Sequence, residues 1–406
     1  MLTYTYTARD PASGQKIKAE VQAENEQAAA RLIQKEGLAP LEIQAKSVIG
    51  KNPIQRFLHR IHTKDKVIFS RQLSTLINAG LPLVQSLRSV AAQTKSKPLQ
   101  VVIASIITDV ESGKPMSGAL AKFPDVFNQV FVSLIAAGET SGTLDAALER
   151  LANQQEKDAE IISKVRGAMI YPVIVLLVMG GVVGFMLVSV LPQVKTLYNG
   201  LPGAHLPTLT VVLLSISEFI ITKWYFVLIG VIILSFLGGR WFKTPAGKQF
   251  VDKAKMKMWP IGPLFMKLYM ARFARTGTTL VASGVPLIQM LHITGQAVDN
   301  VHIKKSLDIA TEKVKGGKAL SLSLTGDTNF LELVPQMLKI GEDSGAIEQM
   351  LEKTADYYEK EVDNQIKAIS TIIEPVLMIV LGVVAITIVA AVLLPIYGLV
   401  GQNVIK

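Results

Sequence analysis

The sequence predicts a mainly α-helical, polytopic membrane protein with two duplicated cytoplasmic helical-bundle domains, three transmembrane helices and a small N-terminal α+β module. Half of the 406 residues are hydrophobic and only 18% are charged. The charges avoid three long apolar stretches and remain frequent elsewhere. That division is typical of an integral membrane protein with large aqueous domains. The second observation behind the prediction is an internal repeat.

A pentapeptide occurs twice, as Gly-Glu-Thr-Ser-Gly at 138–142 and as Gly-Glu-Asp-Ser-Gly at 341–345. The separation is 341 − 138 = 203 residues, and each copy is followed at the same distance by a proline, Pro172 or Pro375, and an apolar run. Upstream, Phe-Ser-Arg at 69–71 returns as Phe-Ala-Arg from Phe273, one residue out of step. Self-similarity over about a hundred residues indicates that one unit, a helical domain followed by a membrane span, was duplicated.

The N-terminal module is predicted from two β-rich segments, Thr3–Thr7 and Lys16–Gln22, a helix over Asn25–Glu36 and a third strand over Leu38–Ile43. In chain order, the predicted parts are the module (1–45), a linker (46–62), the first cytoplasmic helical domain (63–167), transmembrane helix 1 (168–191), an external loop (192–209), transmembrane helix 2 with an interfacial extension (210–239), a basic cytoplasmic connector (240–260), the second cytoplasmic helical domain (261–367), transmembrane helix 3 (368–395) and an external tail (396–406).

Each helical domain is expected to open with a helix and to end in a long one. The opening helix of the first domain carries Leu73, whereas the second has Gly277 at that position, which predicts a weaker helix there. A later helix over Val126–Ala137 is expected to end at the pentapeptide. No strong breaker follows before Gly167, so we expect one continuous helix from Leu144 to Leu191, roughly 70 Å long at 1.5 Å per residue.

Basic residues predict the orientation. Between Arg240 and Arg275, just after the second apolar stretch, nine Lys or Arg stand against one acid, Asp252. The positive-inside rule places that side in the cytoplasm, so both helical domains and the N-terminus are expected there and the C-terminus outside. We place the membrane part of span two at Trp224–Gly239. No secretory signal peptide is found in the first sixty residues.

Several chemistries are disfavoured by the residues. The chain has no cysteine, which excludes disulfides, cysteine metal sites and thiol catalysis. The five histidines lack ligand spacing, and we place His292 on a helix surface and His302 in a loop. No phosphate-binding loop or other catalytic motif is present, so we expect no enzymatic activity, metal or cofactor. The net charge of +10 is concentrated beside a span, which argues against nucleic-acid binding.

The pentapeptides supply the first candidate residues, Gly138, Glu139, Gly142, Gly341, Glu342 and Gly345. One interpretation is structural: each glutamate lies in a helix-to-helix turn near a helix N-terminus, which favours negative charge. The other is that the turns dock a partner. The glycines are expected to provide a positive φ or a close backbone approach.

The spans supply the second set, Tyr171, Pro172, Gly180, Gly184, Glu374 and Pro375. Glu374 precedes Pro375 at the mouth of span three, where the repeat has Tyr171; an ionisable group there is either functional or simply hydrated at the interface. Gly180 and Gly184 form a G-x-x-x-G pattern, which permits close helix contact. We interpret Glu218 and Lys223 as interfacial.

The two helical domains with G-E-x-S-G turns, the Tyr171-Pro172 and Glu374-Pro375 openings, and the F-x-R…L-x-x-G-x-P-L pattern resemble the type II secretion system F / type IV pilus platform protein family of bacterial inner membranes. The resemblance covers essentially the whole chain, with Asp343 in place of the commoner small residue. It implies a non-enzymatic, oligomeric inner-membrane platform. Such platforms couple a hexameric cytoplasmic ATPase to insertion or removal of pilin or pseudopilin subunits, beside other inner-membrane assembly proteins.

Two other function classes stay open. A stator-like ion-conducting protein would use Glu374 or Glu218 as a proton site. A secondary transporter is disfavoured because three spans with few midplane polar groups make a poor substrate site. Under the platform interpretation, we hypothesise that the pentapeptide turns and long helices transmit motion and that Glu374 contacts the membrane segment of a pilin.

Overall fold

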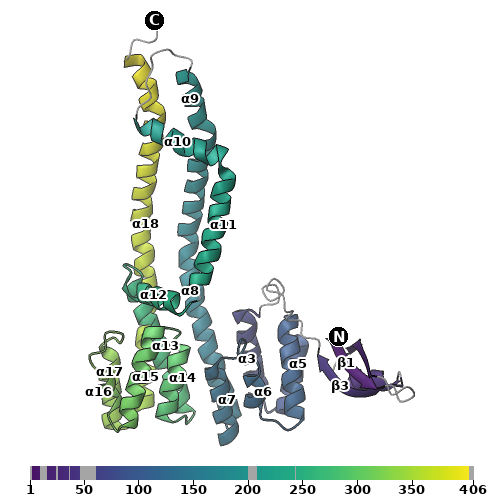
Figure 1. Cartoon of the computed structure of the whole chain (residues 1–406). Helices are drawn as coiled ribbons and strands as arrows, with labels where there is room; N and C mark the ends of the chain where they lie inside the picture. Colours follow the sequence, from purple (N-terminus) through teal and green to yellow (C-terminus); the bar gives the residue numbers. More distant parts are fainter. Residues whose placement is uncertain are drawn as a thin grey trace. The chain divides into compact units, whose positions relative to one another are not determined.

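A computed structural model describes residues 2–9, 16–23, 26–35, 37–45, 61–199, 208–242 and 244–401 (Figure 1). It confirms a mainly helical chain. The structure divides into two compact units, one made of Met1–Glu160 with Tyr269–Tyr358 and the other of Ile161–Leu268 with Glu359–Lys406. The predicted linker, except for its last two residues, lies outside the described residues.

The N-terminal module has three strands and one helix at the predicted places: β1 (Leu2–Arg9), β2 (Lys16–Ala23), α1 (Glu26–Lys35) and β3 (Ala39–Ala45). The strands form an antiparallel sheet in the order β2-β1-β3. Tyr6 and Ala8 lie two apart on β1, so both point to the face that packs on Ile33 of α1.

The first helical domain contains α3 (Thr63–Asn78), α4 (Leu83–Gln93), α5 (Lys97–Glu111), α6 (Met116–Ala121), α7 (Gln129–Ser141) and the start of α8 (Leu144–Phe185). Its core is closed by fully buried aromatic and aliphatic side chains from these helices. The ring of Phe127 contacts those of Phe69 and Phe131, with ring centroids 5.8 and 4.7 Å apart, respectively. The short helix α6 was not predicted from the sequence.

The second helical domain repeats this order with α13 (Gly262–Ala282), α14 (Leu287–Ala297), α15 (Val301–Lys315), α16 (Leu320–Leu324), α17 (Leu333–Ser344) and the start of α18 (Ile347–Gly401). His302 is the second residue of α15, so its placement in a loop was wrong, whereas His292 is exposed on α14. A matching order of long and short helices shows the duplication in three dimensions.

The weak opening helix predicted from Gly277 is not observed. Helix α13 runs unbroken over 21 residues and is longer than α3, which has 16. A Cβ at Gly277 would lie 3.2 Å from Cδ1 of Leu351. The glycine thus admits Leu351 of α18 at the place where Leu73 fills the first domain, and packing outweighs the lower helix propensity of glycine.

Three described helices are long and apolar enough to cross a membrane, as predicted. They are α8 with its continuation, α11 (Trp224–Trp241) and α18. A shorter apolar helix, α10 (Thr208–Thr222), precedes α11, and the two are separated by Lys223, whose φ of −120° and ψ of 26° interrupt the helix. This break supports placing the membrane part of span two at Trp224 and beyond.

Two helix ends differ from the prediction. The first long helix does not stop at Leu191; it passes through a π-helical turn, η1 (Met186–Val190), into α9 (Leu191–Asn199). The ring of Pro192 clashes with the preceding helical turn, and the proline lacks an N–H donor. A π turn just before it accommodates both. Likewise, α18 continues through Pro395 to Gly401, within the segment predicted as a tail.

The second unit has a core of its own where α8, α13 and α18 meet. Ile161, Leu264, Leu268, Val362, Ile366 and Ile369 form its buried cluster. Charged pairs flank it: Lys164 Nζ lies 2.7 Å from Asp363 Oδ2, and Lys267 Nζ lies 2.8 Å from Glu361 Oε2. Helices of both repeats are thereby joined beside the start of their apolar segments.

Candidate functional site

The pentapeptide forms the same helix end in both repeats. Helix α7 extends through it to Ser141, so the expected end at Ala137 was wrong. Gly142 and Gly345 then adopt left-handed conformations with φ of 73° and 69°. The next amide closes the turn: Thr143 donates to the Gly138 carbonyl at 2.9 Å, and the second repeat has the equivalent bond. Only glycine adopts this conformation without steric cost, so the prediction of a positive φ is confirmed here.

The first glycine of each pentapeptide serves close approach. A Cβ at Gly138 would lie 2.6 Å from Cβ of Ala147, and one at Gly341 would lie 2.9 Å from Cα of Ile347. Both distances are too short for carbon atoms. The two glycines therefore let α7 and α17 pack directly against the first turn of α8 and α18, as the predicted close backbone approach requires.

The two glutamates hold the N-termini of the short helices. The carboxylate of Glu139 accepts hydrogen bonds from the backbone N–H of Met116 and, at 3.1 Å, of Ser117, whose hydroxyl donates to it at 2.5 Å. Glu342 accepts from the N–H of Leu320 at 2.6 Å and of Ser321 at 3.2 Å. These amides begin α6 and α16, where helix N–H groups lack partners and the positive end of the helix attracts a carboxylate.

This geometry supports the structural interpretation of Glu139 and Glu342. The helix that each one caps begins more than 20 residues earlier in the chain, so the glutamates fix a long-range contact. Each carboxylate is half-buried, while Thr140 and Asp343 beside them are exposed at the helix ends. A partner-docking role for the turns stays a prediction, with the exposed residues as its candidate surface.

A second shared contact ties each opening helix to the long one. Arg71 of α3 forms ion pairs with Glu149 at 2.8 Å and Glu156 at 2.6 Å on α8, and Arg275 of α13 forms one with Asp356 of α18 at 2.6 Å. Hydrogen bonds from Ser74 and Arg71 hold the pKa of Glu149 below its ordinary value. The repeated F-x-R pattern indicated these arginines, but it did not reveal their partners.

The membrane candidates do not form one site within the described residues. Tyr171 is 57% exposed on α8, and Glu374 is exposed on α18 without a hydrogen bond or ion pair to any described residue. Pro172 and Pro375 lie inside continuous helices. A Cβ at Gly180 or Gly184 would meet nothing within 4 Å, so this G-x-x-x-G face is open.

Glu218 is accounted for by an ion pair. Its Oε2 lies 2.8 Å from Lys195 Nζ, and both side chains are solvent-exposed. The pair links α10 to α9 beyond the membrane segment of α11. This arrangement favours the interfacial interpretation of Glu218 over a proton site.

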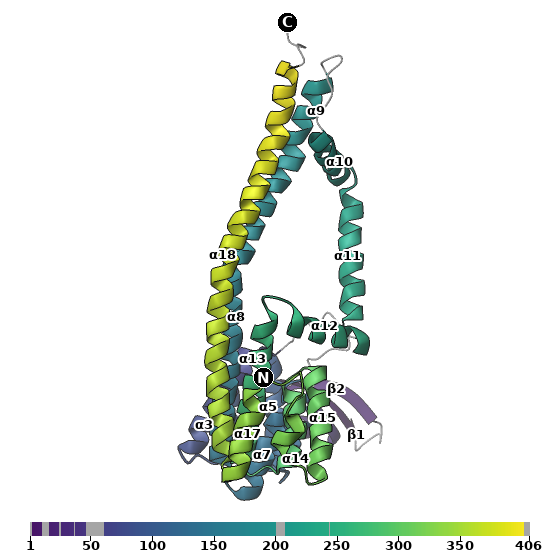
Figure 2. The same cartoon turned by 90° about the vertical axis from the view of Figure 1, so that its left-hand side faces the viewer.

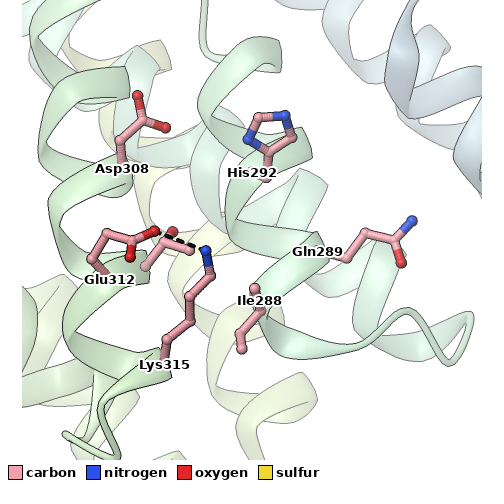
Figure 3. Close-up of a pocket in the computed structure, with 7 residues that line it drawn as sticks. Ile288, Gln289, His292, Asp308, Glu312 and Lys315 are labelled. Carbon is pink, nitrogen blue, oxygen red and sulfur yellow. Dashed lines mark hydrogen bonds and ion pairs between the residues drawn. The ribbon is translucent and has the colours of Figure 1, made fainter.

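One pocket lies between α14 and α15 of the second helical domain (Figure 3). It has a volume of about 400 Å³ and is lined by Ile288, Gln289, His292, Asp308, Thr311, Glu312 and Lys315. Glu312 is paired with Lys315 at 2.8 Å, and Asp308 is paired with Lys304 at 2.8 Å. The described part of the chain holds no cluster of three metal-ligating side chains. Both acids of this pocket are therefore engaged in ion pairs.

Comparisons with known proteins agree with the duplicated architecture. Residues 69–192 and 273–395 each match the family "Type II secretion system (T2SS), protein F", and residues 1–44 match its N-terminal domain. The type IV pilus assembly protein PilC of Thermus thermophilus is 37% identical over 404 residues, 99% of either chain. PilC of Myxococcus xanthus is 35% identical over 96% of this chain and 93% of its own.

The type II secretion system protein F of Pseudomonas aeruginosa is 32% identical over 403 residues, which cover 98% of this chain and 99% of its own. The matched regions contain both pentapeptides, both F-x-R patterns and the first and third apolar helices. On this match and the duplicated fold, the chain belongs to the type II secretion system protein F family.

Proposed function

We propose that this protein is the inner-membrane platform of a type IV pilus or type II secretion machine, and that it couples a hexameric cytoplasmic ATPase to the insertion or extraction of pilin or pseudopilin subunits. The names of the relatives, which refer to pilus assembly and to type II secretion, support the first part. The observation that supports the coupling is the continuity of two long helices. A single helix joins each pentapeptide turn to an apolar segment, because α8 and α18 begin two residues after Gly142 and Gly345.

In this proposal the turns receive motion and the helices transmit it. The first glycine of each pentapeptide holds α7 against α8 and α17 against α18, and the glutamate caps attach α6 and α16 to these pairs. A force on either turn is therefore passed to the long helix, α8 or α18. Helices transmit displacement well because their hydrogen bonds all lie along one axis. Both helical domains and the N-terminus face the cytoplasm and the C-terminus lies outside, as the basic residues beside the spans favour.

The decisive experiment is site-specific photo-crosslinking in the native membrane. Crosslinkers at Thr140 and at Asp343 would probe the two turns, and one at the exposed Lys95, beside the end of α5 that is remote from α6, would serve as the control. We expect the ATPase of a pilus or secretion machine among the captured proteins from at least one turn and not from Lys95. Self-crosslinks alone from both turns would contradict the docking of an ATPase there.

A second part of the proposal is that Glu374 contacts the membrane segment of a pilin-like subunit. Its support is an exposed carboxylate on an apolar helix that has no partner among the described residues. We expect Glu374→Ala to reduce filament assembly strongly, with Tyr171→Phe as the matched change on the other repeat. Normal filaments in Glu374→Ala would contradict this role. Loss of a proton leak in vesicles on the same substitution would instead favour the ion-conducting alternative.

A further inference from the structure

The segment that follows α11 carries a surface that the platform role does not explain. Helix α11 has 18 residues, about 27 Å at 1.5 Å per residue, close to the thickness of a bilayer core. Aromatic side chains mark both of its ends: Trp224 and Tyr225 at the start, Trp241 and Phe242 at the finish. Aromatic residues of this kind favour the two membrane–water interfaces, so Trp241 and Phe242 fix where the span leaves the membrane.

Helix α12 (Pro245–Lys257) starts directly at that boundary. Thr244 caps it by accepting a hydrogen bond from the N–H of Gly247 at 3.1 Å, and Pro245 occupies its first turn. Gly247 packs so tightly under α11 that a Cβ there would overlap the Trp241 carbonyl. The four residue steps from Trp241 to Pro245 span at most about 14 Å of extended chain, so α12 begins within headgroup depth.

Figure 2 shows that α12 turns away at the lower end of α11 instead of extending it. Its exposed surface combines rings with basic side chains. Phe250 is 63% exposed and packs on the ring of Trp241 at 5.6 Å, and Trp259, just after the helix, is 76% exposed. Lys253 and Lys257 lie three and seven residues from Phe250, which places them on the same face of the helix.

Asp252, the only acidic residue of α12, does not offset the positive charge of the exposed lysines. The side chain of Asp252 is only 3% exposed and lies 3.9 Å from Lys255 Nζ. The face of α12 that carries Phe250, Lys253 and Lys257 is therefore aromatic and basic. Exposed rings and lysines together, directly after a span, are typical of a segment at the membrane–water interface, where aromatic rings lie at headgroup level and lysine side chains reach the phosphates.

We propose that α12, with Trp241 and Trp259, lies in the interface where α11 ends and binds the headgroups of anionic phospholipids through Lys253 and Lys257. Covalent continuity with a membrane span favours a lipid over a soluble protein or nucleic acid as the occupant, because the surface cannot leave the bilayer. The rings insert between the headgroups while the lysines stay at phosphate depth. An interfacial helix in addition to the three spans would resist tilting of α11 during assembly.

The chain offers its own depth probe because it has only three tryptophans. In a Trp224→Phe, Trp241→Phe variant, Trp259 is the only tryptophan and can be excited selectively beyond the absorption of the nine tyrosines. The full-length variant is reconstituted into nanodiscs of phosphatidylcholine with a minor fraction of phosphatidylglycerol, in which one or the other lipid is brominated next to the headgroup. We expect brominated phosphatidylglycerol to quench Trp259 more than an equal amount of brominated phosphatidylcholine, and we expect added salt to reduce the difference.

Charge variants test the lysines in the same background. Each lysine near an anionic surface is worth about a fivefold preference, so Lys253→Gln and Lys257→Gln together should lower the phosphatidylglycerol preference by roughly 25-fold. A matched pair, Lys305→Gln and Lys313→Gln, removes equal charge from exposed positions of the second helical domain and should preserve it. Arginine at the two α12 positions should preserve it too.

The outcomes are distinct. Quenching of Trp259 by aqueous acrylamide but by neither brominated lipid would overturn the interfacial placement, and this needs no charge variant. Equal quenching by the two lipids would overturn headgroup recognition. An equal loss of preference in the matched pair would show a general charge effect and contradict the role of α12. None of these readouts depends on pilus assembly or secretion, so the inference is tested separately from the proposed function.

Discussion

Replacement of Glu139 by alanine tests whether the pentapeptide glutamate is a structural cap. The change removes an acceptor of two backbone N–H groups and of the Ser117 hydroxyl. Hydrogen bonds to a charged group contribute about 1.5–3 kcal/mol each when buried, and loss of a helix cap costs about 1 kcal/mol in exposed settings. Since Glu139 is half-buried, we expect α6 to lose about 2–3 kcal/mol of local stability.

The second repeat provides a comparison within the same molecule. Glu342 accepts the two equivalent N–H bonds, but Ser321 contributes only its backbone to it. Glu342→Ala should therefore cost about 1 kcal/mol less, the value of one hydrogen bond. Glu352→Ala, a change of the same type at an exposed position of α18, serves as the control.

Hydrogen–deuterium exchange of the full-length protein in detergent would measure the effect at the amides of α6 and α16. A loss of 2–3 kcal/mol corresponds to roughly 30- to 150-fold faster exchange through local opening. The acceleration should be confined to α6 in Glu139→Ala and to α16 in Glu342→Ala. Unchanged exchange of α6 in Glu139→Ala, or an equal change in Glu352→Ala, would refute the capping role.

Three further predictions concern the helical domains. Gly341→Ala should lower the melting temperature by an amount equivalent to at least about 2 kcal/mol, because its Cβ would lie 2.9 Å from backbone of Ile347; Gly180→Ala, with open space around it, should leave it unchanged. Burial acts to raise the pKa of Asp109, but hydrogen bonds from two lysines outweigh it and hold the pKa below its ordinary value. Its ion pairs therefore stabilise the fold above about pH 4 and are lost as pH falls further, so Asp109→Asn should melt about 1 kcal/mol less stably at pH 7 and match the wild type near pH 2–3; a constant difference across pH would contradict this. Arg71→Lys should cost about 1–2 kcal/mol in urea denaturation, because lysine cannot reproduce the two-pronged contact with Glu156, and an unchanged midpoint would show that the contact is dispensable.

The sequence by itself determined those features that depend on local chemistry. Apolar runs gave the three membrane-spanning helices, since a span must bury its polar backbone in its own hydrogen bonds. The two copies of the pentapeptide gave the duplication and the left-handed glycines at its end, because a helix followed by glycine has few other ways to stop. Period-two alternation gave the strands of the N-terminal module.

Helix ends were harder to predict, because a proline can either end a helix or lie inside one. Pro192 and Pro395 read as stops, yet both helices continue past them. Apolar packing and a π turn tolerate the missing donor, and neither is encoded at the proline itself.

Only the tertiary structure decided what the chemistry-bearing residues contact. Glu139 caps a helix 22 and 23 residues earlier in the chain, and Arg71 meets Glu149 at a separation of 78. Gly277 looked like a weak point until Leu351 was found against it. The face of α12 escaped notice because a basic stretch after a span is already explained by topology. In each case the local sequence allows many partners, and the packing of helices distant in the chain selects one.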